Sequence, residues 1–408
     1  MATITPARTG YGALFRHADY RRLWTANAIS LIGDAVTRIA LPIYVYRITG
    51  SAAALGGTVV LQTLAASLIG LTSGVFVDRL SRKRILTIVP LIQAAMIALL
   101  PLTNALWQVL LITFAASGFA IFTGTTRFAA MPDIVGVTLM PYAAASGQVS
   151  AQIMNIIGPT IGGLLVAAVG INSAFLLDAG TFLIAAALVA TITIPQRTPS
   201  GEAPPLLADF LTGLRYIWSR PVVRFLVFGD LAGDIGYTTM LVLTVALVEG
   251  VLGYGSTVFG LLVAAHAAGF VASALLATRI ANRPGRMRAF VMGGMAVAGV
   301  GLLIAALSPT LPGVFIGWIV LGAGTAPGWT LGNVLWAKLV PSEVRGRTGA
   351  VGNAAASIVQ LVSAGAIGGA AATFGTRGAI GGAGIVQVLT VGAAIALLWR
   401  GWQAMRDV

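Results

Sequence analysis

This 408-residue sequence contains no cysteine and is poor in charged residues. Cysteine is absent, which excludes a disulfide framework, a thiolate metal site and a cysteine nucleophile. Charged residues make up 9% of the chain and hydrophobic residues 57%, whereas a soluble domain carries roughly 25% charged residues. With a mean hydropathy of +0.92, the chain cannot cover a surface that faces water. The composition therefore predicts an integral membrane protein.

Signals for catalysis and for cofactors are also missing. The stretch "GAGTAPG" at 322–328 resembles a nucleotide-binding loop, but it lies within an apolar segment, no strand precedes it and no P-loop lysine follows. The sequence shows no catalytic triad and no cluster of metal ligands. We therefore expect no enzyme activity, no cofactor and no metal, so that an ion gradient or the substrate's own gradient must drive any transport.

Long apolar runs dominate what is present. A helix needs about 20 residues to cross an apolar layer of about 30 Å, because every backbone polar group must be satisfied within the segment. Windows of that length predict an all-α membrane protein with twelve transmembrane helices. The predicted spans are 23–46, 53–77, 85–102, 106–131, 142–168, 172–194, 222–248, 255–278, 289–308, 311–336, 349–373 and 378–399.

The basic residues predict the orientation of these spans. Of the 25 lysines and arginines, all but Arg38, Arg47, Arg127 and Arg377 fall in the two terminal segments and in alternate loops. By the positive-inside rule, both termini and these loops face the cytoplasm. The net charge of +13 is thus shared among short loops and forms no single basic patch, which argues against a nucleic-acid partner. We expect a multi-pass, monomeric protein of the bacterial cell membrane, with the lipid bilayer as its solvent.

A polar segment divides the chain. Residues 195–221 begin rich in Pro, Ser and Gly and continue as an amphipathic stretch, which is typical of a linker followed by a helix on the membrane surface. A shift of 200 residues aligns "LIGD" (31–34) with "LAGD" (231–234). The expected domains are a six-helix bundle at 1–194, a cytoplasmic linker at 195–221 and a second six-helix bundle at 222–408.

Two motifs carry a resemblance to a known family. "GVFVDRLSRKR" (74–84) resembles the signature between the second and third helices of the major facilitator superfamily, with Ser81 where glycine is frequent. "GPTIGG" (158–163) resembles the antiporter motif of its exporters. Together with "LIGDAVTRIALPIYVYRITGSAAALG" and "PSEVRGRTGAVG", they resemble the drug:proton antiporter branch that includes macrolide-efflux and enterobactin-export proteins. The resemblance implies the major facilitator fold and covers nearly the whole chain.

The first motif implies a cytoplasmic gate. By the resemblance, Asp78 faces a helix N-terminus of the other half and latches the cytoplasmic side, supported by Gly74, Arg79 and Arg82. The alternative is that these charges only set topology. We interpret Arg127 as a structural partner of Asp78 or Asp133.

Asp34 is the main candidate for proton coupling. It lies about eleven residues into the first span, hence roughly 16 Å deep, where a charge costs at least about 2.5–3.5 kcal/mol. Burial favours its neutral form, and the cation Arg38 at i+4 favours the carboxylate. The alternative is a permanent Asp34–Arg38 ion pair that positions the helix.

The second half offers two further acids. Asp230 and Asp234 share a helix face at i and i+4 and are candidates for a second proton or cationic-substrate site. The alternative is hydrogen bonding to Ser or Thr of adjacent helices. Roles for Asp178 and His266 stay open, and Glu249 is expected to be solvated at the outer mouth.

The remaining candidates concern helix packing and the substrate. Gly158 and Pro159 should bend the fifth span, and the glycines Gly162 and Gly163 should let another helix approach closely and seal the interface against leak. The substrate cavity is expected between spans 1, 2, 4, 5 and 7, 8, 10, 11. Candidates for lining it are Asn27, Gln62, Gln152, Asn155, Tyr237, Asn333 and Trp336.

The sequence therefore predicts a secondary transporter that exports a hydrophobic or amphipathic small molecule in exchange for protons, by alternating access. A dedicated exporter of one metabolite such as a siderophore, an importer or a uniporter are the alternatives within transport. A non-transporting membrane receptor is the alternative from another class, although a receptor has no use for buried acids.

Overall fold

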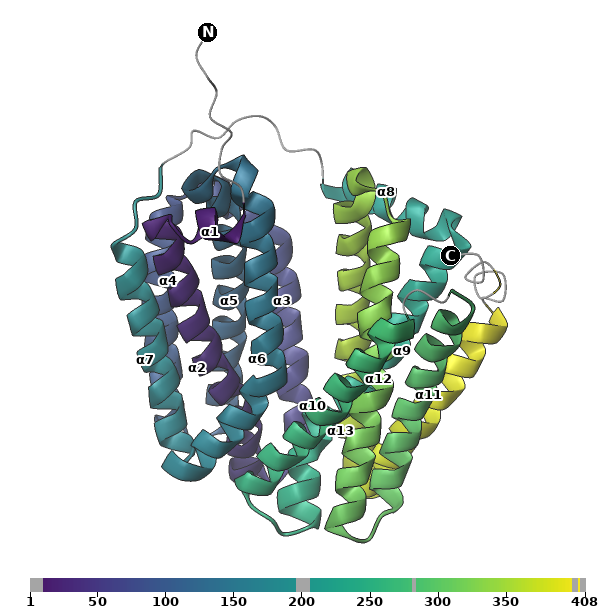
Figure 1. Cartoon of the computed structure of the whole chain (residues 1–408). Helices are drawn as coiled ribbons and strands as arrows, with labels where there is room; N and C mark the ends of the chain where they lie inside the picture. Colours follow the sequence, from purple (N-terminus) through teal and green to yellow (C-terminus); the bar gives the residue numbers. More distant parts are fainter. Residues whose placement is uncertain (1–9, 196–205, 281–283, 398–402, 404–408) are drawn as a thin grey trace. The chain divides into compact units, whose positions relative to one another are not determined.

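The described part of the chain is helical. A computed structural model describes residues 10–195, 206–280, 284–397 and 403 (Figure 1). Within these residues every regular element is a helix. The elements are α1 (Tyr11–Leu14), α2 (Ala18–Thr49), α3 (Ala52–Arg79), α4 (Arg82–Leu99), η1 (Leu100–Leu102), α5 (Leu106–Val135), η2 (Val137–Leu139), α6 (Met140–Val169), α7 (Ile171–Ala190), α8 (Leu206–Ser219), α9 (Pro221–Val245), the π-helix η3 (Ala246–Val251), α10 (Ser256–Ile280), α11 (Pro284–Leu307), α12 (Leu311–Leu339) and α13 (Ser342–Leu397).

These helices confirm the predicted all-α membrane fold. Ten of them are long and apolar enough to cross a membrane. The 56-residue α13 accounts for two predicted spans, since Gly375 interrupts it with φ 73° and ψ 165°. This left-handed backbone is open to glycine at little cost. The predicted fifth span lies within α6, and the predicted sixth span runs four residues past the end of α7 at Ala190.

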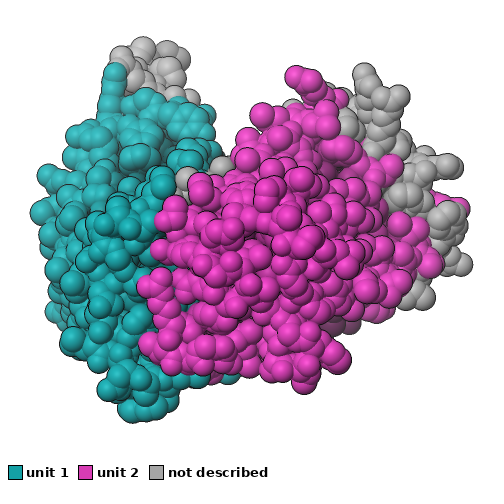
Figure 2. Space-filling view, turned by 90° about the horizontal axis from the view of Figure 1, so that it is seen from below, with its two compact units in different colours: residues 1–44, 64–201 teal, residues 45–63, 202–408 magenta. Residues whose placement is uncertain are grey.

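The chain packs into two compact units. Unit 1 contains residues 1–44 and 64–201, and unit 2 contains residues 45–63 and 202–408 (Figure 2). The end of α2 and the start of α3 thus pack with the C-terminal half of the chain. The division into 1–194, 195–221 and 222–408 stays a prediction.

Unit 1 is held together by close contacts among its helices. Leu23 and Ala26 of α2, Leu86 of α4, and Ala185 and Val189 of α7 belong to one buried apolar cluster. The α6 helix also lies close to α2, as a Cβ atom placed on Gly162 would be 2.7 Å from the backbone oxygen of Ala35. Only small residues allow such an approach.

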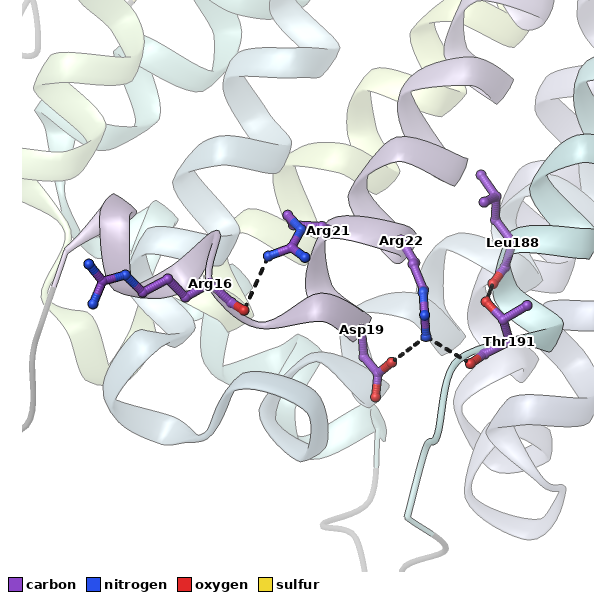
Figure 3. Close-up of polar contacts among 6 residues, drawn as sticks. All are labelled: Arg16, Asp19, Arg21, Arg22, Leu188 and Thr191. Carbon is purple, nitrogen blue, oxygen red and sulfur yellow. Dashed lines mark hydrogen bonds and ion pairs between the residues drawn. The ribbon is translucent and has the colours of Figure 1, made fainter.

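Polar contacts fix the start of α2 in unit 1 (Figure 3). Arg22 donates to Asp19 at 3.3 Å and to the backbone oxygen of Thr191 at 3.1 Å, which ties α2 to the end of α7. Arg21 donates to the backbone oxygen of Arg16 at 3.2 Å and so closes the turn between α1 and α2. The helix that carries Asp34 is therefore anchored at its first turn.

Unit 2 has a methionine-rich core and includes residues from the first half of the chain. Met287, Met292 and Met295 lie in its main buried cluster. A Cβ at Gly56 of α3 would lie 2.5 Å from the backbone oxygen of Ala364, so α3 and α13 are in close contact there. The N-terminal end of α3 is therefore part of the packing of unit 2.

The surface helix α8 has one face packed and one face exposed. Ile217 is buried, and Gly213 lies against the backbone of Arg347. The exposed side carries large apolar side chains at helical spacing. They are Phe210, Leu211, Leu214 and Trp218. This pattern is typical of a helix at a membrane surface.

Candidate transport site

Unit 1 contains a small pocket with Asp34 at one end. Four helices line it: α2, α4, α5 and α7. The lining residues are Leu23, Ala26, Asn27, Ser30, Leu31, Asp34, Leu86, Pro90, Gln93, Ala120, Thr123, Gly124, Arg127, Phe182, Ala185 and Val189. Most of these come from the first halves of α2 and α4 and the second halves of α5 and α7, which lie at the same end of the helices. The cavity volume is about 100 Å³, enough for a few water molecules but below the roughly 300 Å³ at which drug-sized ligands are held.

Two cations lie within electrostatic range of Asp34. The guanidinium groups of Arg38 and Arg127 both act electrostatically on its carboxyl group. Arg38 follows on the same helix at i+4, whereas Arg127 comes from α5 and lines the pocket beside Asp34. The Thr123 hydroxyl oxygen, one turn before Arg127, is buried and has no hydrogen-bond partner in the described structure. The pocket can therefore hold water or a proton beside a carboxyl group balanced by two cations.

A second carboxyl group lies next to this site. Asp178 of α7 is 1% exposed. Thr37 of α2 donates to its Oδ2 at 2.5 Å, and Thr181 donates to its Oδ1 at 3.2 Å. The charge of Asp34 also acts on Asp178. The carboxyl group of Asp34 therefore lies within electrostatic range of the carboxyl group of Asp178 and of the guanidinium groups of Arg38 and Arg127, all in unit 1.

The structure assigns the charges near the first motif differently from the sequence expectation. Arg82 donates to Asp133 at 2.5 Å and to the backbone oxygen of Ala129 at 2.9 Å. Arg127, which we expected beside Asp78 or Asp133, lies within electrostatic range of Asp34. Because the side chain of Asp78 lies outside the described residues, the expected pairing of Arg127 stays a prediction.

Three other residues of the predicted gate cannot be placed. The side chains of Asp78 and Arg79 and the surroundings of Gly74 lie outside the described residues. The latch at Asp78 therefore stays a prediction.

The antiporter motif packs against the helix that carries Asp34. A Cβ at Gly158 would lie 2.7 Å from the Cβ of Ala35, and one at Gly162 would meet Ala35 and Ile39. Pro159 lies within α6, and Gly163 is buried. The glycines thus hold α6 against the turn of α2 that contains Asp34.

The two acids of unit 2 interact with each other. Asp230 is exposed, Asp234 is half-buried, and the charge of Asp230 acts on Asp234. The Oδ2 atom of Asp234 is buried without a hydrogen-bond partner in the described structure, and so is the hydroxyl oxygen of Thr238 one turn later. The alternative in which this oxygen bonds a neighbouring Ser or Thr thus finds no support among the described contacts.

The predicted substrate-lining residues are spread over both units. Asn27 lines the pocket of unit 1. In unit 2, Tyr237 and Asn333 are exposed, Gln62 is half-buried, and Asn333 donates to the backbone oxygen of Trp329 at 2.6 Å. Trp336 packs against an apolar cluster. That cluster contains Ile217, Val223, Val340 and Val351. The side chains of Gln152 and Asn155 lie outside the described residues.

One ion pair of unit 2 was not expected. Arg47 Nη2 lies 3.1 Å from Glu249 Oε1, and the Glu249 side chain is only 12% exposed. The expectation of a solvated Glu249 is thus wrong, because the π-helix η3 places it against the end of α2. The described residues contain no group of three or more His, Asp or Glu side chains that could hold a metal ion.

The described helices define a multi-pass, all-α membrane protein with the fold of a membrane transporter. The chain matches the family described as transmembrane secretion effector over residues 9–406, and it belongs to that family.

Individual relatives agree with this assignment. The chain is 28% identical to the "Multidrug efflux pump Tap" of Mycolicibacterium fortuitum over 84% of this chain and 88% of that protein. It is 29% identical to the "Enterobactin exporter EntS" of Escherichia coli O1:K1 / APEC, over 51% of each chain.

Solved structures show the same fold at low identity. A bacterial homologue of the human lysosomal transporter Spinster superposes with a TM-score of 0.73 at 14% identity, covering 96% of this chain and 97% of that one. A bacterial homologue of the iron transporter ferroportin gives 0.69 at 14% identity, covering 95% and 99%.

Sequence reasoning left Asp178 without a role and passed over its threonine partners. A signal was present, since "DAVT" (34–37) and "DAGT" (178–181) repeat an acid followed three residues later by threonine. This spacing places both side chains on one helix face. Each of these two helix faces thus carries a carboxyl group and a hydroxyl group that can form hydrogen bonds with the other face.

Proposed function

We propose that the protein exports a hydrophobic or amphipathic small molecule across the cytoplasmic membrane in exchange for protons moving inward, by alternating access. The observation that carries the proposal is the Asp34 carboxyl group in the pocket of unit 1, under the opposed charges of Arg38 and Arg127. A carboxyl group inside a membrane-spanning helix is costly. A role in proton exchange accounts for its presence.

The pocket supports a role with protons better than one with the substrate. At about 100 Å³ it admits water but no drug-like molecule. Substrate would act on this site indirectly, by changing how closely the two arginines approach Asp34. When the arginines engage the carboxylate, the proton leaves, and when they withdraw, the carboxyl group takes up a proton.

The direction and the substrate class rest on the relatives. Export of drug-like compounds follows the multidrug efflux pump, which aligns with most of the chain. Both termini then face the cytoplasm, in keeping with the basic loops, and the pocket opens toward that side. The protein acts as a monomer.

A dedicated exporter of one metabolite is the second candidate. The similarity to an enterobactin exporter favours it, although that alignment covers half of each chain. A siderophore such as enterobactin is larger and more polar than a lipophilic dye. Competition between the two in one transport assay separates the candidates.

Transport in proteoliposomes tests the proposal. Purified protein is reconstituted, a pH gradient with an acidic interior is imposed, and uptake of the lipophilic cation ethidium is followed by fluorescence. We expect ethidium to accumulate in vesicles with the wild-type protein and not with Asp34→Asn, and to leak out when nigericin abolishes the gradient. Asp19→Asn is the matched control, because Asp19 is a partly exposed acid on the same helix. Accumulation that is independent of the gradient, or equal in Asp34→Asn, would contradict proton coupling through Asp34.

A further inference from the structure

Asp178 is the one charged residue among the fully buried side chains that the structure describes. It lies eight residues into α7, which belongs to the membrane-spanning helices. An ionised carboxylate at such a place loses its hydration, and this loss is costly unless a cation or several donors replace the water. The partners of Asp178 therefore decide which form of the acid the site accommodates.

Both side-chain partners of Asp178 are hydroxyl groups. Thr37 meets Oδ2 at 2.5 Å, and Thr181 meets Oδ1 at 3.2 Å while also donating to the Asp178 backbone oxygen at 2.7 Å. A hydroxyl group can donate a hydrogen bond to a carboxylate or accept one from the neutral acid. An arginine can only donate. The surroundings of Asp178 are thus suited to both protonation states.

The charges near the two acids are distributed unequally. Asp34 faces Arg38 on its own helix and Arg127 on α5. The charge that acts on Asp178 is the carboxylate of Asp34, and within the described residues neither α4 nor α6, which also pack against α7, places a charge on it. Asp34 is therefore the acid on which two cations act, and Asp178 is the acid on which the described residues place no cationic charge.

Gly33 explains how the two acids come together. A Cβ at Gly33 would lie 2.3 Å from Asp178 Oδ1 and 2.2 Å from Thr181 Oγ1. The backbone of α2 therefore lies directly over the Asp178 carboxyl group and separates it from water. Asp34, the next residue, opens into the pocket. Of the two acids, Asp34 lines the pocket and Asp178 does not.

We propose that Asp178, bound by Thr37 and Thr181, is the site that holds the transported proton, and that Asp34 with its arginines connects this site to the pocket. This inference rests on the proposed function and divides its chemistry between two acids. In the release step the O–H bond of neutral Asp178 breaks, the proton passes to the Asp34 carboxylate and from there to water, and Thr37 donates to the Asp178 carboxylate that remains. To load Asp178, the proton moves in the opposite direction, from water to the Asp34 carboxylate and from there to the Asp178 carboxylate.

Infrared spectroscopy tests the inference without a substrate. The carbonyl stretch of a protonated carboxyl group is separate from that of a carboxylate, so pH-difference spectra of the purified protein report which acids change protonation. In the wild type we expect a protonated-carboxyl band that changes with pH and has one component from Asp178. This component should be lost in Asp178→Asn and retained in Asp34→Asn and in the surface control Asp19→Asn.

Two results would overturn the assignment. One is a wild-type spectrum without such a band, and the other is a difference spectrum of Asp178→Asn that equals the wild-type one. If Asp178→Asn does not fold, as judged by gel filtration, the same infrared measurement on Thr37→Val tests the assignment. Loss of the hydroxyl group at Oδ2 should shift the carbonyl frequency, and an unshifted band would contradict the assignment.

Ethidium transport separates this inference from the proposed function. Wild-type accumulation that responds to the pH gradient, with at least a tenfold loss in Asp178→Asn but unchanged ethidium equilibration without a gradient, supports the proton site. Gradient-driven accumulation that is normal in Asp178→Asn refutes the proton site and leaves the proposed function intact. A wild-type protein that ignores the gradient while its Asp178 band titrates refutes the proposed function instead.

Discussion

The ion pair between Arg82 and Asp133 allows a quantitative test of the packing in unit 1. Arg82 is the first residue of α4, and Asp133 lies in the last turn of α5. Each charge is unfavourable with the dipole of its own helix, by about 0.3–1 kcal/mol. At 2.5 Å, with side-chain exposures of 19% and 7%, each charge compensates the other.

Replacing one partner should therefore cost more than replacing both. Arg82→Leu removes the guanidinium from a buried carboxylate at a helix C-terminus, and such changes cost about 2–5 kcal/mol. The partial exposure of Arg82 places the expected loss near ~2–3 kcal/mol. Asp133→Asn should cost about 1–2 kcal/mol, since Arg82 keeps its bond to Ala129. In the double variant both dipole conflicts disappear, so we expect a coupling energy of at least ~1 kcal/mol.

Equilibrium unfolding in mixed micelles of dodecyl maltoside and sodium dodecyl sulfate measures these free energies. The control cycle uses Arg22 and Asp19, whose side chains are 47% and 33% exposed. Their coupling should stay below about 0.5 kcal/mol. Costs that add without coupling at Arg82 and Asp133, or equal coupling in the two cycles, would refute the reasoning.

Three further predictions concern packing and backbone, and apparent thermal stability in detergent checks each of them. Gly162→Leu should lower the stability by about 1–3 kcal/mol because the leucine side chain would collide with α2. Gly147→Leu is the control on the same helix and should change the stability little, since a Cβ at Gly147 has nothing within 4 Å. Equal effects of the two substitutions would argue against the close approach. Arg47→Gln, which removes the charge that pairs with Glu249, should cost at most about 1 kcal/mol, since Arg47 is 51% exposed. High salt should remove the difference in stability from the wild type. A loss that persists in high salt would mean that packing, and not charge, holds the two side chains together. Gly375→Ala should cost roughly 1–2 kcal/mol at φ 73°, and an unchanged or raised stability would place that residue in ordinary helix geometry.

The membrane-spanning helices could be predicted from the sequence because a lipid interior leaves few choices. Every backbone polar group must be paired within the segment, so the length of an apolar run determines the helix. The α2, α5 and α12 helices each contain a predicted span, although α12 begins its helix with Pro at its N-terminal turn and α2 holds Pro42 inside. The one clear overrun, past Ala190 of α7, arose because the apolar residues continue beyond the last helical turn.

The partners of the site residues could not be predicted in the same way. Successive residues of a helix point about 100° apart, so the rotation of each helix decides which side chains meet. That rotation depends on close contacts such as Gly33 against Asp178 and Gly162 against Ala35. The sequence identified Asp34 and Arg38 because they share one helix. Arg127 and Asp178 reach Asp34 from other helices, and hydropathy carries no information about that.

Proton release by the purified protein tests most directly whether substrate and proton are coupled through the acids of unit 1. Ethidium is added to the protein in weakly buffered detergent solution, and the change in pH is followed with an indicator dye. The account predicts that ethidium releases protons from the wild type and from Asp19→Asn, and that it releases none from Asp34→Asn or Asp178→Asn. Binding of ethidium to the wild type without proton release, or release from Asp34→Asn or Asp178→Asn equal to that of the wild type, would contradict it.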